Sequence, residues 1–159
     1  MKHAELVKWL KTLLLIVGAI GLVFFLWVFP VFGKEIARMD PARAYLYWPC
    51  LIFVWFSGVL LYTAFWFLWQ ICGEIAKDHS FCEKNAVNLG RISKIALVES
   101  VLCTVGTVVL FLLNAVRPIM LLIFVLLILV GFAASLASAV AARLVQKASE
   151  LKHDQDLTI

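Results

Sequence analysis

The sequence predicts an all-α membrane protein that crosses the bilayer four times. Hydrophobic residues make up 64% of the 159 residues, and the mean hydropathy is +1.01, more than a soluble core needs. Four apolar stretches each reach the roughly 20 residues that cross a hydrocarbon core. They cover residues 12–32, 45–72, 95–113 and 119–142. We expect one domain, built as a bundle of four transmembrane helices.

The first stretch is interpreted as an uncleaved anchor. Cleavable signal peptides have a shorter apolar region, roughly 7–15 residues, followed by small residues at the cleavage site. The stretch in this chain is longer and ends in Phe29-Pro30-Val31-Phe32-Gly33.

The second stretch follows a short charged connection over residues 34–44, in which Asp40-Pro41 predicts a turn. Tyr62 falls deep in the stretch, and its hydroxyl needs a partner within the protein because lipid offers none. The stretch opens with three aromatic residues of the kind that favour the membrane interface: Tyr45, Tyr47 and Trp48.

The connection over residues 73–94 contains a helix start. Ser80-Phe81-Cys82-Glu83 fits a capping box, in which Ser80 and Glu83 satisfy each other's backbone N–H groups. A helix beginning at Phe81 is therefore predicted to run into the third stretch. Either this is a helix start and nothing more, or a partner docks on three of its residues: Phe81, Asn85 and Asn88.

Among the four apolar stretches, the third alone contains an acidic residue, Glu99. The sequence places it near the inner end of that stretch. A charged side chain at the centre of a membrane helix costs roughly 2.5–3.5 kcal/mol on insertion scales. Either Glu99 pairs with Lys94 or Arg143, or it is a proton- or ligand-responsive intramembrane site. A weakly polar stripe continues along the same helix: Ser100, Cys103, Thr104, Thr107 and Asn114.

The fourth stretch is predicted to be a packing helix, because small residues on one face let helices approach closely. The face consists of Gly131, Ser135, Ser138 and Ala142. A tail over residues 143–159 follows. Its end, with Leu157, Thr158 and Ile159, either adds as a strand to a partner's sheet edge or is disordered.

Positive charge predicts the orientation, because short cytoplasmic loops are rich in Lys and Arg. Four such residues fall on one side: Lys34, Arg38, Arg43 and Arg117. Ten fall on the other: Lys2, Lys8, Lys11, Lys77, Lys84, Arg91, Lys94, Arg143, Lys147 and Lys152. We expect both termini and the connection over residues 73–94 to be cytoplasmic, in the plasma (inner) membrane of a bacterium. The charge does not indicate direct binding of nucleic acid.

The sequence gives no indication of an enzyme or of a cofactor. It lacks a nucleophile elbow, a phosphate-binding glycine loop and a clustered set of metal ligands. Three histidines lie far apart, and four cysteines lack the spacing of a zinc site. No catalytic or metal-binding residue is predicted.

The layout resembles an uncharacterised bacterial family of four-helix membrane proteins, domain of unknown function 2975. The resemblance is carried by the segment Ser80-Phe81-Cys82-Glu83-Lys84-Asn85 and by the terminal Asp156-Leu157-Thr158-Ile159. In the family pattern Ser or Thr usually follows the Phe, where this chain has Cys82. Proteins of such families are often encoded beside small helix-turn-helix regulators, so the resemblance implies a role in sensing or in controlling a transcription factor.

We therefore expect a non-enzymatic regulatory or sensory membrane protein with a cytoplasmic protein partner. The alternative is a defence, immunity or small permeation component that acts as a homo-oligomer, for which the polar stripe around Glu99 matters most. A third possibility is a packing partner in a larger complex, recognised through the small residues of the fourth stretch.

Overall fold

The computed structural model describes residues 2–77, 82–116 and 118–157. Within these ranges the chain is helical apart from short turns, and it forms no strand. Four helical stretches are long and apolar enough to cross a membrane: Val7–Met39, Pro41–Ile75, Glu83–Leu112 and Leu121–Gln155. The all-α class and the four predicted spans are confirmed.

The first span contains a π-helical segment. Helix α1 (Lys2–Val23) passes into η1 (Phe24–Val28) and then into α2 (Phe29–Met39). Pro30 has no N–H and disturbs the α-helical ladder before it, and the Phe29 N–H bonds to the Phe24 carbonyl, five residues earlier. The helix continues beyond its predicted end at residue 32, so the connection between the first two spans is shorter than expected.

The predicted turn at Asp40-Pro41 is confirmed. Asp40 leaves the helical conformation with φ −132° and ψ 80°, and Pro41–Leu46 forms the short 3-10 helix η2. The Arg43 side chain donates to Asp40 Oδ2 at 2.5 Å, and the Arg43 N–H donates to the Asp40 carbonyl at 3.0 Å. This local pairing closes the connection to α3 (Tyr47–Ile75).

Helix α4 (Glu83–Leu112) begins two residues later than predicted, after Cys82 in an extended conformation. Ser80 and Phe81 lie outside the described residues, so the capping box is not described. Asn114 follows the end of α4 and has a positive φ of 52°, a conformation that asparagine tolerates. It therefore lies in the turn and does not extend the polar stripe.

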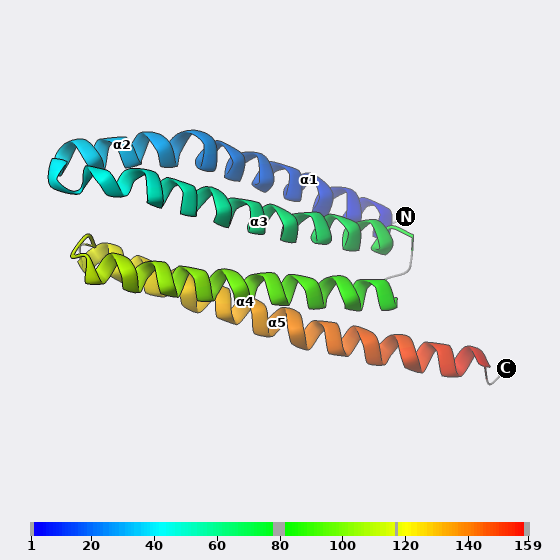
Figure 1. Cartoon of the computed structure of the whole chain (residues 1–159). Helices are drawn as coiled ribbons and strands as arrows, with labels where there is room; N and C mark the ends of the chain where they lie inside the picture. Colours follow the sequence, from blue (N-terminus) through cyan, green and yellow to red (C-terminus); the bar gives the residue numbers. More distant parts are fainter. Residues whose placement is uncertain (1, 78–81, 117, 158–159) are drawn as a thin grey trace.

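Helix α5 (Pro118–Leu157) runs without interruption through most of the predicted tail. Leu157 is helical without a partner, so the end is not disordered at this residue, and addition as a strand to a partner stays a prediction. Thr158 and Ile159 lie outside the described residues. The helix extends beyond the first turn of α4 (Figure 1).

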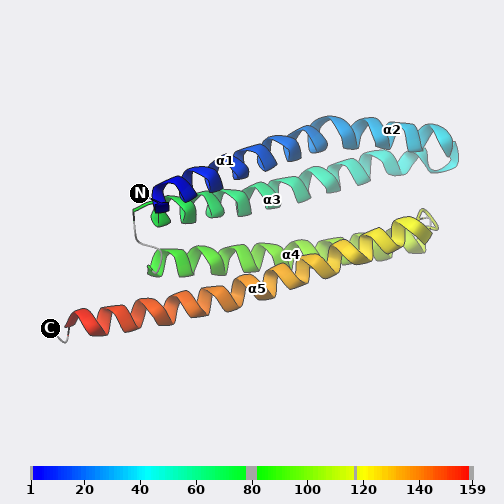
Figure 2. The ribbon, with the colours of Figure 1, turned by 180° about the vertical axis from the view of Figure 1, so that it is seen from behind.

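The four spans form an open row. Among the described residues each long helix packs only on its neighbours in chain order: α1 on α3, α3 on α4, and α4 on α5. Figures 1 and 2 show the same order from opposite sides, with both termini at one end. Most large apolar side chains are exposed, Trp27 and Leu126 among them, as expected for surfaces that face lipid.

Candidate functional site

The first hairpin consists of the first span (α1, η1 and α2) and α3, and the second consists of α4 and α5. Aromatic side chains of α3 hold the first hairpin by donating hydrogen bonds to carbonyls of the opposite helix. Trp55 Nε1 donates to the Phe25 carbonyl at 3.2 Å. In a π-helical turn this carbonyl would accept from residue 30, which is a proline without an N–H. The Trp55 indole on α3 thus donates to the Phe25 carbonyl, which lacks this N–H donor within its own span.

Tyr62 makes a second bond of this kind. Its hydroxyl donates to the Gly18 carbonyl at 2.5 Å. The hydroxyl therefore has the hydrogen-bond acceptor within the chain that the sequence analysis predicts. Gly21 lies beside it, and a Cβ there would approach the hydroxyl to 3.2 Å. Small residues on α1 therefore allow the phenol to reach the backbone.

The second hairpin uses the predicted small-residue face of α5. Ser93 Oγ donates to the Ser135 carbonyl at 2.8 Å, and Ser135 Oγ donates to the Ser93 carbonyl at 2.9 Å. Ser135 is only 3% exposed, and a Cβ at Gly131 would overlap Ser100 Oγ. Ser138 and Ala142 are half-buried. Gly131 and Ser135 are thus occupied within the chain by α4.

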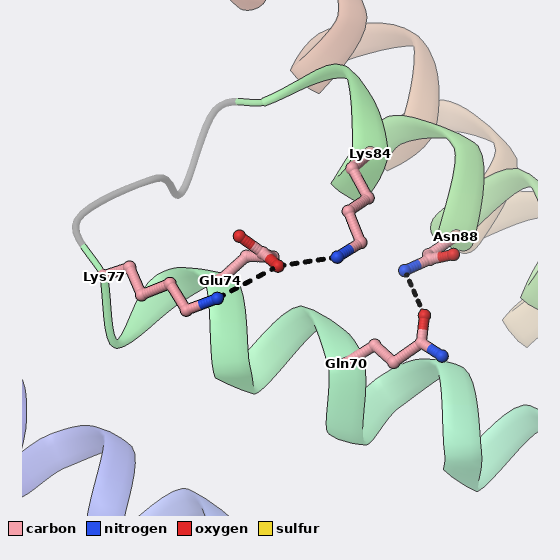
Figure 3. Close-up of polar contacts among 5 residues, drawn as sticks. All are labelled: Gln70, Glu74, Lys77, Lys84 and Asn88. Carbon is pink, nitrogen blue, oxygen red and sulfur yellow. Dashed lines mark hydrogen bonds and ion pairs between the residues drawn. The ribbon is translucent and has the colours of Figure 1, made fainter.

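A polar cluster joins α3 and α4 at the end of the molecule that carries both termini. Figure 3 shows Lys77 and Lys84 reaching the same carboxylate oxygen of Glu74, at 3.7 and 2.7 Å, while Asn88 donates to Gln70 at 3.2 Å. The carboxylate of Glu74 beside Lys84 raises the pKa of the lysine ammonium, mainly through their hydrogen bond. This cluster fixes the register between the two hairpins.

The structure contradicts a docking face on Asn85 and Asn88. Their exposed fractions are 1% and 2%, so neither side chain is available to a partner. Phe81, the third residue of the predicted face, lies outside the described residues. The two asparagines belong to the interior of the helix contacts, where buried amides need hydrogen-bond partners.

The hydroxyls of the predicted polar stripe bond to their own helix. Ser100, Thr104 and Thr107 each donate to the carbonyl four residues earlier, at 2.7 Å. This back-bonding is the usual way for serine and threonine to satisfy a hydroxyl inside a helix. The stripe consequently does not present a free row of donors.

Glu99, on the polar stripe of α4, makes a further contact with α3. Ser57 Oγ donates to Glu99 Oε1, and Cys103 Sγ donates to the same oxygen at 3.5 Å. The other oxygen, Oε2, is buried and has no hydrogen-bond partner among the described residues. Within the same ranges Glu99 forms no ion pair with Lys94 or Arg143, so the predicted pairing is not observed.

Glu99 lies deeper than the sequence suggested. Its partner Ser57 follows Tyr47 by ten residues and precedes Gln70 by thirteen, which places it about 15 Å and about 20 Å along α3 from these two residues. The carboxyl group therefore faces the middle of the second span. At that depth it accepts the hydrogen bonds of Ser57 and Cys103.

Sequence reasoning missed the partners of these residues on α3 and α4. Ser57 and Ser93 are single hydroxyls in apolar surroundings, and Gln70 and Glu74 lie near a helix end. Their polarity was the signal in the sequence, but which of them pair depends on the register between α3 and α4, which the structure supplies.

Comparisons with known proteins agree with this architecture. A family model described as "Protein of unknown function (DUF2975)" matches residues 31–159. A curated relative, "Uncharacterized membrane protein YoaS" of Bacillus subtilis (strain 168), is 22% identical over 152 residues, which cover 94% of this chain and 95% of the relative. No solved structure gives a significant match.

Proposed function

The chain belongs to the DUF2975 family, and we propose that it is a non-enzymatic regulatory or sensory protein of the bacterial plasma membrane that acts through a cytoplasmic protein partner. The observation that carries the proposal is the projecting end of α5. The positive charge at the end with both termini supports a cytoplasmic position for that segment.

The register between α4 and α5 defines the projecting segment. Ser93 pairs with Ser135, so Val145 lies level with Glu83, where α4 begins. The next twelve residues, 146–157, extend about 18 Å further as a helix. A helical segment that continues from a membrane span and has no other helix alongside within the described ranges is suited to contact another protein.

The side chains of the segment support recognition by a groove. Leu151 belongs to the segment, and Leu144 lies just before it, seven residues earlier on the same face; they are 65% and 63% exposed. Apolar anchors at this spacing are typical of amphipathic helices that bind in an apolar groove. Charged residues surround them, including Lys147, Glu150 and Lys152, which keeps the segment soluble when no partner is bound.

The helix contacts suggest how a signal would travel. Because α5 packs along α4 and α4 contacts α3 through a small number of polar bonds, a shift of α4 against α3 would move the projecting segment with it. The polar stripe, bonded to its own helix, gives less support to a permeation pathway.

In-cell crosslinking followed by affinity capture tests the proposal. Full-length protein is compared with a form that ends after Val145, which keeps all four spans. We expect a soluble protein to be recovered with the full chain and lost with the truncated form. Leu151→Asp should reduce recovery at least tenfold, whereas the matched control Gln155→Asp, which adds the same charge without removing an apolar anchor, should not.

Two outcomes would contradict the proposal. One is recovery of the same proteins with and without residues 146–159. The other is capture of the chain itself and nothing else, which would favour a homo-oligomer and a permeation or immunity role. Equal amounts of each variant in the membrane fraction serve as the control for insertion.

A further inference from the structure

We propose that Glu99 is a proton-binding site inside the membrane, located between α3 and α4. The inference does not depend on the partner proposed for α5, because it concerns the chemistry of one carboxyl group. It begins from the depth of that group, which faces Ser57 at the middle of the second span.

The hydrogen bonds of the carboxyl group are one-sided. Ser57 and Cys103 both donate to Oε1, whereas Oε2 is buried without a hydrogen-bond partner in the described part of the chain. An ionised carboxylate would leave half of its charge on an oxygen that accepts no hydrogen bond from the described residues. Burying a charge in this way is far more costly than burying the neutral acid, so the group binds a proton.

No cation faces the carboxyl group from the helices packed around it. Between Tyr47 and Gln70, α3 has no Asp, Glu, Lys, Arg or His; its titratable groups there are Cys50 and Tyr62. The Tyr62 hydroxyl is directed to Gly18 of α1. The sequence of α5 carries its first charge at Arg143.

On α4 itself the titratable neighbours are Cys103, in contact with Glu99, and Lys94. Lys94 is exposed and lies five residues earlier, a spacing that turns it away from the face of Glu99. A bound proton is thus the positive charge that remains to neutralise the Glu99 carboxylate. Loss of this proton would leave an unpaired charge at the contact between the two hairpins and weaken that contact.

Dicyclohexylcarbodiimide, an apolar carbodiimide, tests the proposal in native membranes. It reacts with protonated carboxyl groups: the carboxyl oxygen bonds to the carbodiimide carbon, the acid proton moves to one carbodiimide nitrogen, and rearrangement gives a stable N-acylurea. Peptide mass spectrometry then locates the adduct. A water-soluble carbodiimide, applied in parallel, reports on carboxyl groups that water reaches.

We expect the apolar reagent to modify Glu99 at neutral pH. The water-soluble reagent should modify the exposed Glu83 and leave Glu99 unlabelled. Glu99→Gln keeps an oxygen that accepts from Ser57, removes the acid and should abolish the adduct at this position. Infrared spectroscopy gives a second readout, a carboxylic-acid C=O band that is lost in Glu99→Gln.

The proposal is overturned if Glu99 is labelled equally by both reagents, because the group is then in water. It is also overturned if the band lost in Glu99→Gln at neutral pH is that of a carboxylate, whether or not the apolar reagent labels the site. The reagent could fail to label Glu99 although the native protein shows the carboxylic-acid band and Glu99→Gln does not. That result still supports the proposal, because the spectrum reports the proton directly.

Discussion

Gly131 faces Ser100 across the contact between α4 and α5, and replacing it with alanine tests that packing. An added Cβ would overlap Ser100 Oγ, which is held by its bond to the Ala96 carbonyl at 2.7 Å. Ser100 is only 2% exposed, so its side chain has little space into which to move. Overpacking of this kind costs about 1–3 kcal/mol, and the higher helix propensity of alanine returns up to about 1 kcal/mol.

We therefore expect Gly131→Ala to lower the free energy of unfolding by about 1–2 kcal/mol. Ser100→Ala alone should have a small effect, because its hydroxyl bonds only to its own helix. In the double variant the nearest atom to the new methyl group is the residue-100 Cβ at 3.6 Å, an ordinary contact. The double variant should recover most of the loss, which gives a coupling energy of about 1–2 kcal/mol.

Unfolding in mixed micelles of mild detergent and dodecyl sulfate, followed by circular dichroism, measures these differences. Gly90→Ala is the matched control, because nothing lies within 4 Å of a Cβ at that position, and it should not destabilise the protein. If Ser100→Ala fails to reduce the effect of Gly131→Ala, the close contact between α4 and α5 is not formed as described.

Three further predictions concern hydrogen bonds and use the same unfolding measurement. Tyr62→Phe removes the donor to the Gly18 carbonyl and should cost about 0.6–1.7 kcal/mol, the range for polar contacts between membrane helices; no change would mean that the hydroxyl is satisfied elsewhere. Asn88→Ala leaves Gln70 Oε1 without its donor and should cost about 1–3 kcal/mol, and a cost that persists in a Gln70→Ala background would contradict the pairing. Ser135→Ala should cost about 0.6–1.7 kcal/mol, whereas Ser135→Leu should be much worse because the site is 3% exposed; a harmless leucine would show that α5 does not pack there.

Hydropathy alone was enough to predict the four spans, since membrane crossing depends on length and apolar content. The turn at Asp40-Pro41 and the need of Tyr62 for a partner also followed from single residues. The use of Gly131 and Ser135 in close helix packing followed from their spacing, although the neighbouring helix could not be identified from the sequence.

The depth of Glu99 could not be predicted, because it depends on the register between α3 and α4. Counting from the apolar stretch alone placed the residue near an inner end, whereas the pairing of Asn88 with Gln70 moves it to mid-span. The register comes from side-chain bonds between helices that lie far apart in the chain, and hydropathy contains no information about them.

The helical end of α5 was missed for a related reason. Its polar residues have no apolar stretch around them and hydropathy predicts a tail, yet they continue a helix that is already nucleated by the preceding span. Extending an existing helix costs far less than starting one.

The open row of helices has a consequence for biosynthesis. Because each span, in the part of the chain that the structure describes, contacts only the spans next to it in the chain, the hairpin of α1 and α3 can complete these contacts while the ribosome is still translating the second half. Each later helix then finds its docking surface already inserted, and none has to wait for a segment that has not yet been made. Assembly of this molecule is thus ordered by the direction of translation itself.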